Sequence, residues 1–146
     1  MQACRNDQRH VWLLSGTGEG PVLVAALVAQ GWRVSVSVVS ASAAGAYAGL
    51  SLEDLWRGPL DGVEGILGVL DQARDRHQGF DWVVDATHPF AVKISKDLQR
   101  ACQQFAQPLL RFERPMEGCG EASLIASSAD LARQTLQGSR LLMALG

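Results

Sequence analysis

Apolar residues recur along the chain in short blocks of two kinds, and the two kinds alternate. Short apolar or Val/Ser-alternating runs predict strands, and apolar residues at i, i+3, i+4 and i+7 predict helices. The predicted strands cover residues 11–14, 33–39, 52–57, 81–85, 108–112 and 140–145. The predicted helices between them cover residues 19–31, 61–79, 94–105 and 127–138.

This alternation of strands and helices determines the expected fold class. Parallel strands need long crossover connections, and helices fill that role on both faces of a sheet. The sequence therefore predicts an α/β fold, a Rossmann-like doubly wound parallel sheet in a single three-layer domain over residues 11–146. The polar residues 1–10 are expected to form a flexible N-terminal tail. Ligands of such folds bind at the carboxyl ends of the strands, so the turns after the strands are the places to examine.

Size, charge and cysteine content narrow the class of protein. A chain of 146 residues with 47% hydrophobic content is long enough for one packed domain. Thirteen basic residues against 15 acidic ones give a net charge of -2, which argues against binding to nucleic acid or an anionic membrane. The apolar stretches are too short to span a bilayer, and the start lacks the apolar middle of a signal peptide. We expect a cytoplasmic protein with reduced thiols and no metal site, because no cysteine has metal-ligand spacing.

A glycine-rich turn follows the first predicted strand. Gly16, Gly18 and Gly20 stand between that strand and a helix, where backbone amides and the helix N-terminus favour a phosphate. Gly16, Thr17, Gly18 and Glu19 are therefore expected to bind a nucleotide cofactor. Pro21 breaks the dinucleotide pattern GxGxxG, and a merely tight turn is the alternative interpretation.

The end of the second predicted strand bears on the identity of that cofactor. NAD-binding sites usually place an acidic residue there, on the ribose. This chain has Val39-Ser40-Ala41-Ser42 instead, without a carboxylate to repel a 2'-phosphate. Ser40 or Ser42 could donate to such a phosphate, which favours NADPH, although no arginine stands beside them.

The turn after the strand at residues 81–85 is dense in functional groups. It reads Asp85-Ala86-Thr87-His88-Pro89-Phe90-Ala91. Thr87 and His88 are candidates for substrate binding, and His88 is also the candidate proton donor because an imidazole exchanges protons near neutral pH. The alternative is structural, with Thr87 or His88 capping the next helix and Phe90 packed in the core.

A third turn carries two arginines. Arg111 and Arg114 flank Phe112-Glu113 at the end of the strand at residues 108–112. Guanidinium groups at a ligand-binding edge suit carboxylates and phosphates, and an arginine that is simply solvated is the alternative.

Together, the segments 16–20, 85–91 and 110–115 resemble the precorrin-6A reductase family in residues, order and spacing. The resemblance implies an NADPH-dependent oxidoreductase acting on a CH–CH group. It would reduce precorrin-6A, or its cobalt-containing counterpart, to the 6B form in cobalamin biosynthesis. Thr87, His88, Arg111 and Arg114 would meet the peripheral carboxylates of this corrinoid substrate.

The resemblance also implies a two-domain enzyme with the cofactor in the cleft between the domains. The second domain of the family would begin about where this chain stops, so a further domain or subunit would complete the cleft. Two other classes remain open. An S-adenosylmethionine-dependent methyltransferase shares the Gly16-x-Gly18-x-Gly20 spacing but usually has an acidic ribose ligand where Ser40 stands. A truncated, non-catalytic nucleotide-binding module is the other.

Overall fold

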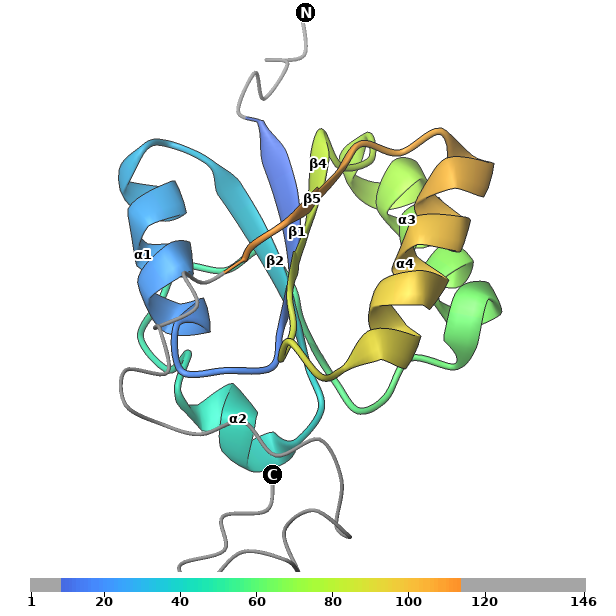
Figure 1. Cartoon of the computed structure of the whole chain (residues 1–146). Helices are drawn as coiled ribbons and strands as arrows, with labels where there is room; N and C mark the ends of the chain where they lie inside the picture. The colour runs from blue at the N-terminus through green and yellow to red at the C-terminus, as the bar shows by residue number, and fades with distance from the viewer. Residues whose placement is uncertain (1–8, 114–146) are drawn as a thin grey trace, which may run out of the picture. The chain divides into compact units, whose positions relative to one another are not determined.

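The structure, a computed structural model, describes residues 9–113. It contains the following strands and helices in chain order (Figure 1): β1 (His10–Ser15), α1 (Gly20–Ala29), β2 (Arg33–Val38), α2 (Ala41–Gly45), β3 (Leu55–Arg57), α3 (Gly62–His77), β4 (Trp82–Ala86), α4 (Val92–Phe105) and β5 (Leu109–Arg111). The predicted helix at residues 127–138 and strand at residues 140–145 lie outside the described residues, as does most of the predicted tail.

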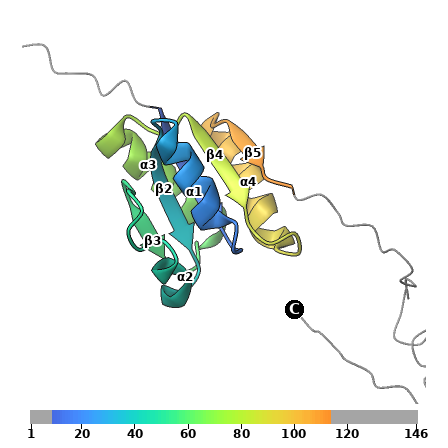
Figure 2. The ribbon, with the colours of Figure 1, turned by 90° about the vertical axis from the view of Figure 1, so that its left-hand side faces the viewer.

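All five strands form one parallel sheet in the order β3-β2-β1-β4-β5. Helices α1 and α2 cover one face, and α3 and α4 cover the other (Figures 1 and 2). The predicted doubly wound α/β sheet is therefore confirmed for this part of the chain. The direction of strand addition reverses between β1 and β4, which is where such sheets bind their ligands.

The central strand β1 separates two hydrophobic clusters. Val11 and Leu13 pack under α1, whereas Trp12 and Leu14 pack under α3 and α4. All six residues of β1 are buried, as expected for a strand covered by helices on both faces. The carboxyl end of this strand is thereby held rigidly at the ligand-binding edge.

Serines inside β2 are explained by donors on β1. Ser35 and Ser37 are buried, and the second one accepts a hydrogen bond of 2.9 Å from the indole Nε1 of Trp12. Ser35 Oγ lies 2.8 Å from Nε2 of His10. The Val/Ser alternation of β2 therefore separates an apolar face from a hydrogen-bonded one. His10 is itself the first residue of β1 and is buried, so the expected end of the tail is one residue too late.

Two local predictions differ from the structure. The third strand begins at Leu55 and not at residue 52, and the Ala-rich segment after β2 contains the short helix α2. Asp61 is the N-cap of α3 as predicted, but its side chain makes no capping hydrogen bond. Within residues 9–113, no helix has both the length and the apolar character needed to cross a bilayer.

Candidate functional site

The glycine turn and the His88 loop touch at the carboxyl edge of the sheet. A Cβ atom at Gly16 would lie 3.1 Å from the backbone nitrogen of His88 and 3.3 Å from Cα of Thr87. Residue 16 must therefore be very small for the loops after β1 and β4 to meet. Two segments that sequence analysis selected separately thus form one site.

The other two glycines of the turn have different surroundings. A Cβ atom at Gly20 would overlap the Tyr47 hydroxyl and Ser15 Oγ, so this glycine is needed for packing beneath the turn. At Gly18, a Cβ atom would meet nothing within 4 Å. Gly18 also lacks the positive φ that favours glycine. The described residues give no packing reason for glycine at this position, which leaves open space above the turn.

The start of α1 is available to an anion. Its N-cap residue is Glu19, and no side chain makes a capping hydrogen bond there. Pro21 occupies the first turn, where a missing amide hydrogen costs little. The partial positive charge of the helix N-terminus therefore lies beside the open space at Gly18.

Tyr47 supports the turn from below. It follows α2, is 4% exposed, and its burial raises the pKa of the phenol, while the nearby Ser15 hydroxyl opposes that shift. This side chain therefore remains protonated and holds the α2 segment against the start of α1.

Asp85 organises the loop after β4. This carboxylate is 2% exposed. Its Oδ1 accepts hydrogen bonds from the backbone N–H of Thr87, at 3.1 Å, and from the Thr87 hydroxyl, at 2.6 Å. Its Oδ2 accepts a charged hydrogen bond of 2.7 Å from Nη1 of Arg111 on β5. The buried charge is thus neutralised and fully used in fixing the loop.

These contacts change the roles expected for two residues. The Thr87 hydroxyl proton is donated to Asp85, so it is not available to a substrate carboxylate. Arg111 also donates to Ser95 Oγ on α4, and its Nε lies 3.8 Å from Glu113. Both residues lie at the predicted edge, but their strongest contacts hold the loop in place. Arg114 lies outside the described residues.

His88 is the exposed imidazole of the site. Its Nδ1 accepts the backbone N–H of Phe90 at 3.2 Å, which assigns the proton of the neutral ring to Nε2. The two rings lie 5.1 Å apart, and Phe90 is 84% exposed. Neither Thr87 nor His88 caps α4, whose N-cap is Ala91. The alternative that placed Phe90 in the core is therefore wrong, because the loop turns outward before the helix begins.

Ser40 has a structural contact of its own at the end of β2. Its Oγ accepts the backbone N–H of Ala43 at 3.1 Å and lies 3.0 Å from Ser42 Oγ, so it caps α2. The structure also brings an arginine to this place. Arg57, the last residue of β3, is in register with Val38 and is exposed. Sequence analysis missed it because the two residues are neighbours only through strand pairing, although the predicted end of the third strand was a usable signal.

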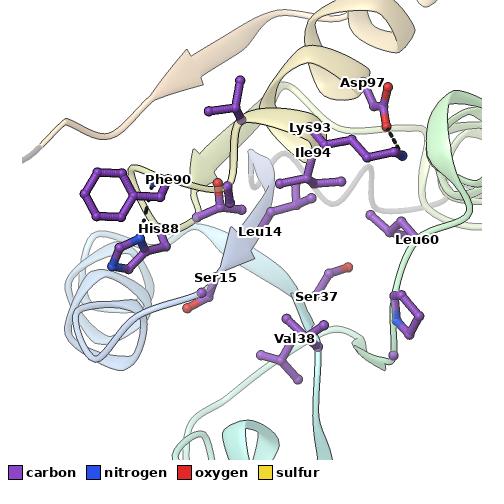
Figure 3. A pocket seen from close by; sticks show the side chains of 17 residues that line it. Leu14, Ser15, Ser37, Val38, Leu60, His88, Phe90, Lys93, Ile94 and Asp97 are labelled. Atoms are coloured by element: carbon purple, nitrogen blue, oxygen red, sulfur yellow. Dashed lines mark hydrogen bonds and ion pairs between the residues drawn. The ribbon is translucent and has the colours of Figure 1, made fainter. Parts of the chain in front are cut away.

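A pocket of about 480 Å³ opens at this edge of the sheet (Figure 3). We call it the Leu60 pocket, after a residue of its wall. It lies between the ends of β1 and β2, the segment 58–60 and the start of α4. Gly16, Thr87 and His88 line it, whereas Thr17, Gly18, Glu19, Ser40 and Arg111 do not.

Comparison with known proteins identifies the family. The model of the precorrin-6x reductase family CbiJ/CobK matches residues 10–146. This chain belongs to that family. Among curated relatives, a precorrin-6A reductase of Mycobacterium tuberculosis is 36% identical over 124 residues, covering 84% of this chain and 46% of the relative. A cobalt-precorrin-6A reductase of Synechocystis is 29% identical over 141 residues, covering 93% of this chain and 52% of the relative.

A solved structure agrees with these relatives. The structure of a CobK precorrin-6A reductase matches with a TM-score of 0.67 and 28% identity, over 89% of this chain and 50% of that chain. The chain thus spans about half the length of the family members it matches. Membership in a reductase family and the parallel α/β fold are shown together.

Proposed function

We propose that this chain holds NADPH in a precorrin-6A reductase and presents it to precorrin-6A or cobalt-precorrin-6A during cobalamin biosynthesis. The observation that carries the proposal is the contact between the glycine turn and the His88 loop, with 3.1 Å between the Cβ position of Gly16 and the nitrogen of His88. A cofactor held at the first loop would lie directly beside the second. Positioning of this kind is the main protein contribution to hydride-transfer catalysis.

The reaction itself needs few protein groups. NADPH supplies the hydride when bound, and with one proton it reduces a double bond of the macrocycle, leaving NADP⁺. His88 is the candidate donor of that proton, because Nε2–H is the free end of its neutral ring. Asp85 and Thr87 keep the loop in place, and the Arg111 side chain, 31% exposed, faces the same edge beside them. A further domain or subunit would cover this edge and complete the cleft.

Several features fit the phosphates of NADPH. The open space at Gly18 beside the uncapped start of α1 suits the pyrophosphate. No carboxylate stands in the segment Val38-Val39-Ser40 that ends β2, and the Arg57 guanidinium comes from the neighbouring strand. An arginine at this place favours a 2'-phosphate, so we assign Arg57 together with Ser40 to the choice of NADPH over NADH.

The cofactor assignment is tested by calorimetric titration with NADPH, NADH and S-adenosylmethionine. We expect micromolar NADPH binding, weaker NADH binding, and a loss of this preference in Arg57→Ala. Binding of S-adenosylmethionine without NADPH would refute the reductase proposal and support a methyltransferase. Failure of this chain and of its longer form to bind NADPH would favour a non-catalytic module.

The role of His88 is tested separately. In a protein that includes the remaining half of the family's length, we expect His88→Ala to reduce corrinoid binding or turnover at least ten-fold with little change in NADPH affinity. His88→Gln keeps a donor but cannot deliver a proton, so it should retain binding better than turnover. An equal loss of folding stability and of both functions would show that His88 is only structural.

A further inference from the structure

The Leu60 pocket is not explained by the motifs that define the site. It lies on the side of the sheet covered by α3 and α4, because its residues Leu14, Leu60 and Ile94 belong to the hydrophobic cluster of that side. Most of the glycine turn, from Thr17 to Glu19, lies outside it. The pocket is therefore a separate compartment next to the phosphate position.

The shape and lining of the pocket suit a flat, apolar group. Leu14, Val38, Leu60 and Ile94 line it, and Figure 3 shows these side chains around the opening. Ser37 adds a hydroxyl whose oxygen already accepts the Trp12 indole, so its proton is available to a ligand acceptor. A volume of about 480 Å³ accommodates one heterocycle with its sugar, not a tetrapyrrole with all its carboxylate arms.

The charges of the pocket also disfavour a polycarboxylate. Its lysine and its aspartate are Lys93 and Asp97, and they pair with each other at 2.9 Å (Figure 3). The Asp97 side chain is 13% exposed, and Lys93 offsets its charge. The wall is close to neutral, and its buried carboxylate would repel an anionic ligand arm. An uncharged ligand group fits these conditions.

The pocket begins where the phosphate position ends. Ser15 and Gly16 line the pocket, and the open space at Gly18 lies two residues further along the same turn. A ligand anchored by its phosphates at the start of α1 would therefore reach the pocket with the group attached to those phosphates.

We propose that the Leu60 pocket binds an uncharged nitrogen heterocycle of the dinucleotide and excludes the corrinoid. This inference rests on the proposed function, since it assumes that the dinucleotide is the ligand of the turn. Adenine and nicotinamide share the required chemistry, being flat heterocycles with an amino or carboxamide group. The corrinoid would then lie outside the pocket, on the side of the exposed His88 and Phe90.

The experiment narrows the pocket from its rim without touching the core. Val39 lines the pocket and is 65% exposed, so Val39→Trp adds bulk at the opening. Leu110, which is 51% exposed on β5 and does not line the pocket, supplies the matched control Leu110→Trp. Pro59→Trp narrows the opposite wall and replaces Val39→Trp if that variant does not fold. Circular dichroism and urea midpoints establish folding.

Calorimetric titrations use NADPH, adenosine 2',5'-bisphosphate and nicotinamide mononucleotide as probes. We expect Val39→Trp to weaken NADPH binding at least ten-fold and Leu110→Trp to change it less than two-fold. The half-molecule that weakens in parallel identifies the heterocycle in the pocket.

The outcomes separate this inference from the proposed function. Unchanged binding of NADPH and of both halves by a folded Val39→Trp variant would overturn the inference alone. Weaker corrinoid binding with unchanged NADPH binding would overturn it too, by assigning the pocket to the substrate. Absence of NADPH binding by the unsubstituted protein would overturn both.

Discussion

At the scale of single residues, Asp85 has the most consequential contacts in the site. It is nearly completely buried, and both of its oxygens are used, one by Thr87 and the other by Arg111. Charged hydrogen bonds of this kind hold a loop more rigidly than neutral ones. The conformation that presents His88 therefore depends on a carboxylate that itself does not face the ligand.

Replacement of this carboxylate tests that dependence. We expect Asp85→Asn to lower the free energy of unfolding by about 1–3 kcal/mol, because it removes the partner of Arg111 and adds an amide where two donors converge. Urea denaturation measures the change. The matched control is Asp71→Asn, whose pair with Arg74 is exposed and should contribute within about 0.5 kcal/mol. Equal effects of the two substitutions would contradict the assigned role of Asp85.

Gly18 provides a second test at this scale. Gly18→Ala should leave the urea midpoint nearly unchanged, because its Cβ atom meets no protein atom, but should weaken NADPH binding at least five-fold. Gly68→Ala is the control. Gly68 also has free space around it but lies within α3, where alanine should stabilise by roughly 0.5–1 kcal/mol and leave NADPH affinity unchanged. Unaltered NADPH affinity in Gly18→Ala would place the cofactor elsewhere.

The candidate residues could be found from the sequence, but their partners could not. The glycines, Thr87, His88 and Arg111 were visible because they follow predicted strands. That Thr87 and Arg111 converge on Asp85 depends on the pairing of β4 with β5, which no local pattern specifies.

At the scale of elements, the contact between β1 and β2 creates a pH dependence. Burial, aided by the nearby charge of Arg33, lowers the pKa of His10 from 6.5 to about 4. The unfolded chain therefore takes up a proton between these two values that the folded protein does not bind. We expect stability to fall as the pH decreases from 6.5 to about 4, with no further loss from this group below that range.

Urea midpoints across that range measure the effect. His10→Gln keeps a side chain that can hydrogen-bond to Ser35 but does not titrate, so its stability should depend less on pH in this interval. If the two proteins lose stability in parallel, the carboxylates and not His10 cause the dependence.

The contact between α1 and the segment after α2 gives another test. Gly20→Ala should destabilise by roughly 1–3 kcal/mol, because the new Cβ atom overlaps Tyr47 and Ser15. Tyr47→Phe removes one of the two overlapping oxygens, so the double variant should recover part of the loss. Strictly additive effects in thermal or urea denaturation would exclude this contact as the cause.

Most elements followed from periodicity, whereas their ends did not. Strands β1, β2 and β4 are continuous apolar or alternating runs, and their prediction needs only local sequence. Helix α2 was missed because five small residues carry no helical stripe. The start of α4 differs because Phe90 is exposed, which a composition rule for aromatic residues does not anticipate.

At the scale of the whole molecule, the chain supplies one side of a cleft. It covers 50% of the matching CobK chain, and its site lies open at one edge of the sheet. We expect the 146-residue chain to bind NADPH but to oxidise it with precorrin-6A only when the rest of the family's length is joined to it or added. Ligand at about 100 times its Kd should stabilise the chain by about 2.7 kcal/mol.

A thermal-shift titration and NADPH absorbance measure these two properties on the same samples. Full turnover by the 146-residue chain alone would contradict the requirement for a second half. The parallel, doubly wound sheet itself was predictable from alternating elements, but the order β3-β2-β1-β4-β5 depends on long-range pairing.

The hydrogen bond from Trp12 to Ser37 has a practical consequence for all of these variants. The Trp12 indole is fully buried in the central strand, so its N–H reaches solvent deuterium only when the sheet itself opens. Its exchange rate, followed by NMR, therefore records global opening and should not respond to local change at the glycine turn. A substitution that abolishes NADPH binding while this one proton exchanges at its original rate has damaged the site and not the fold.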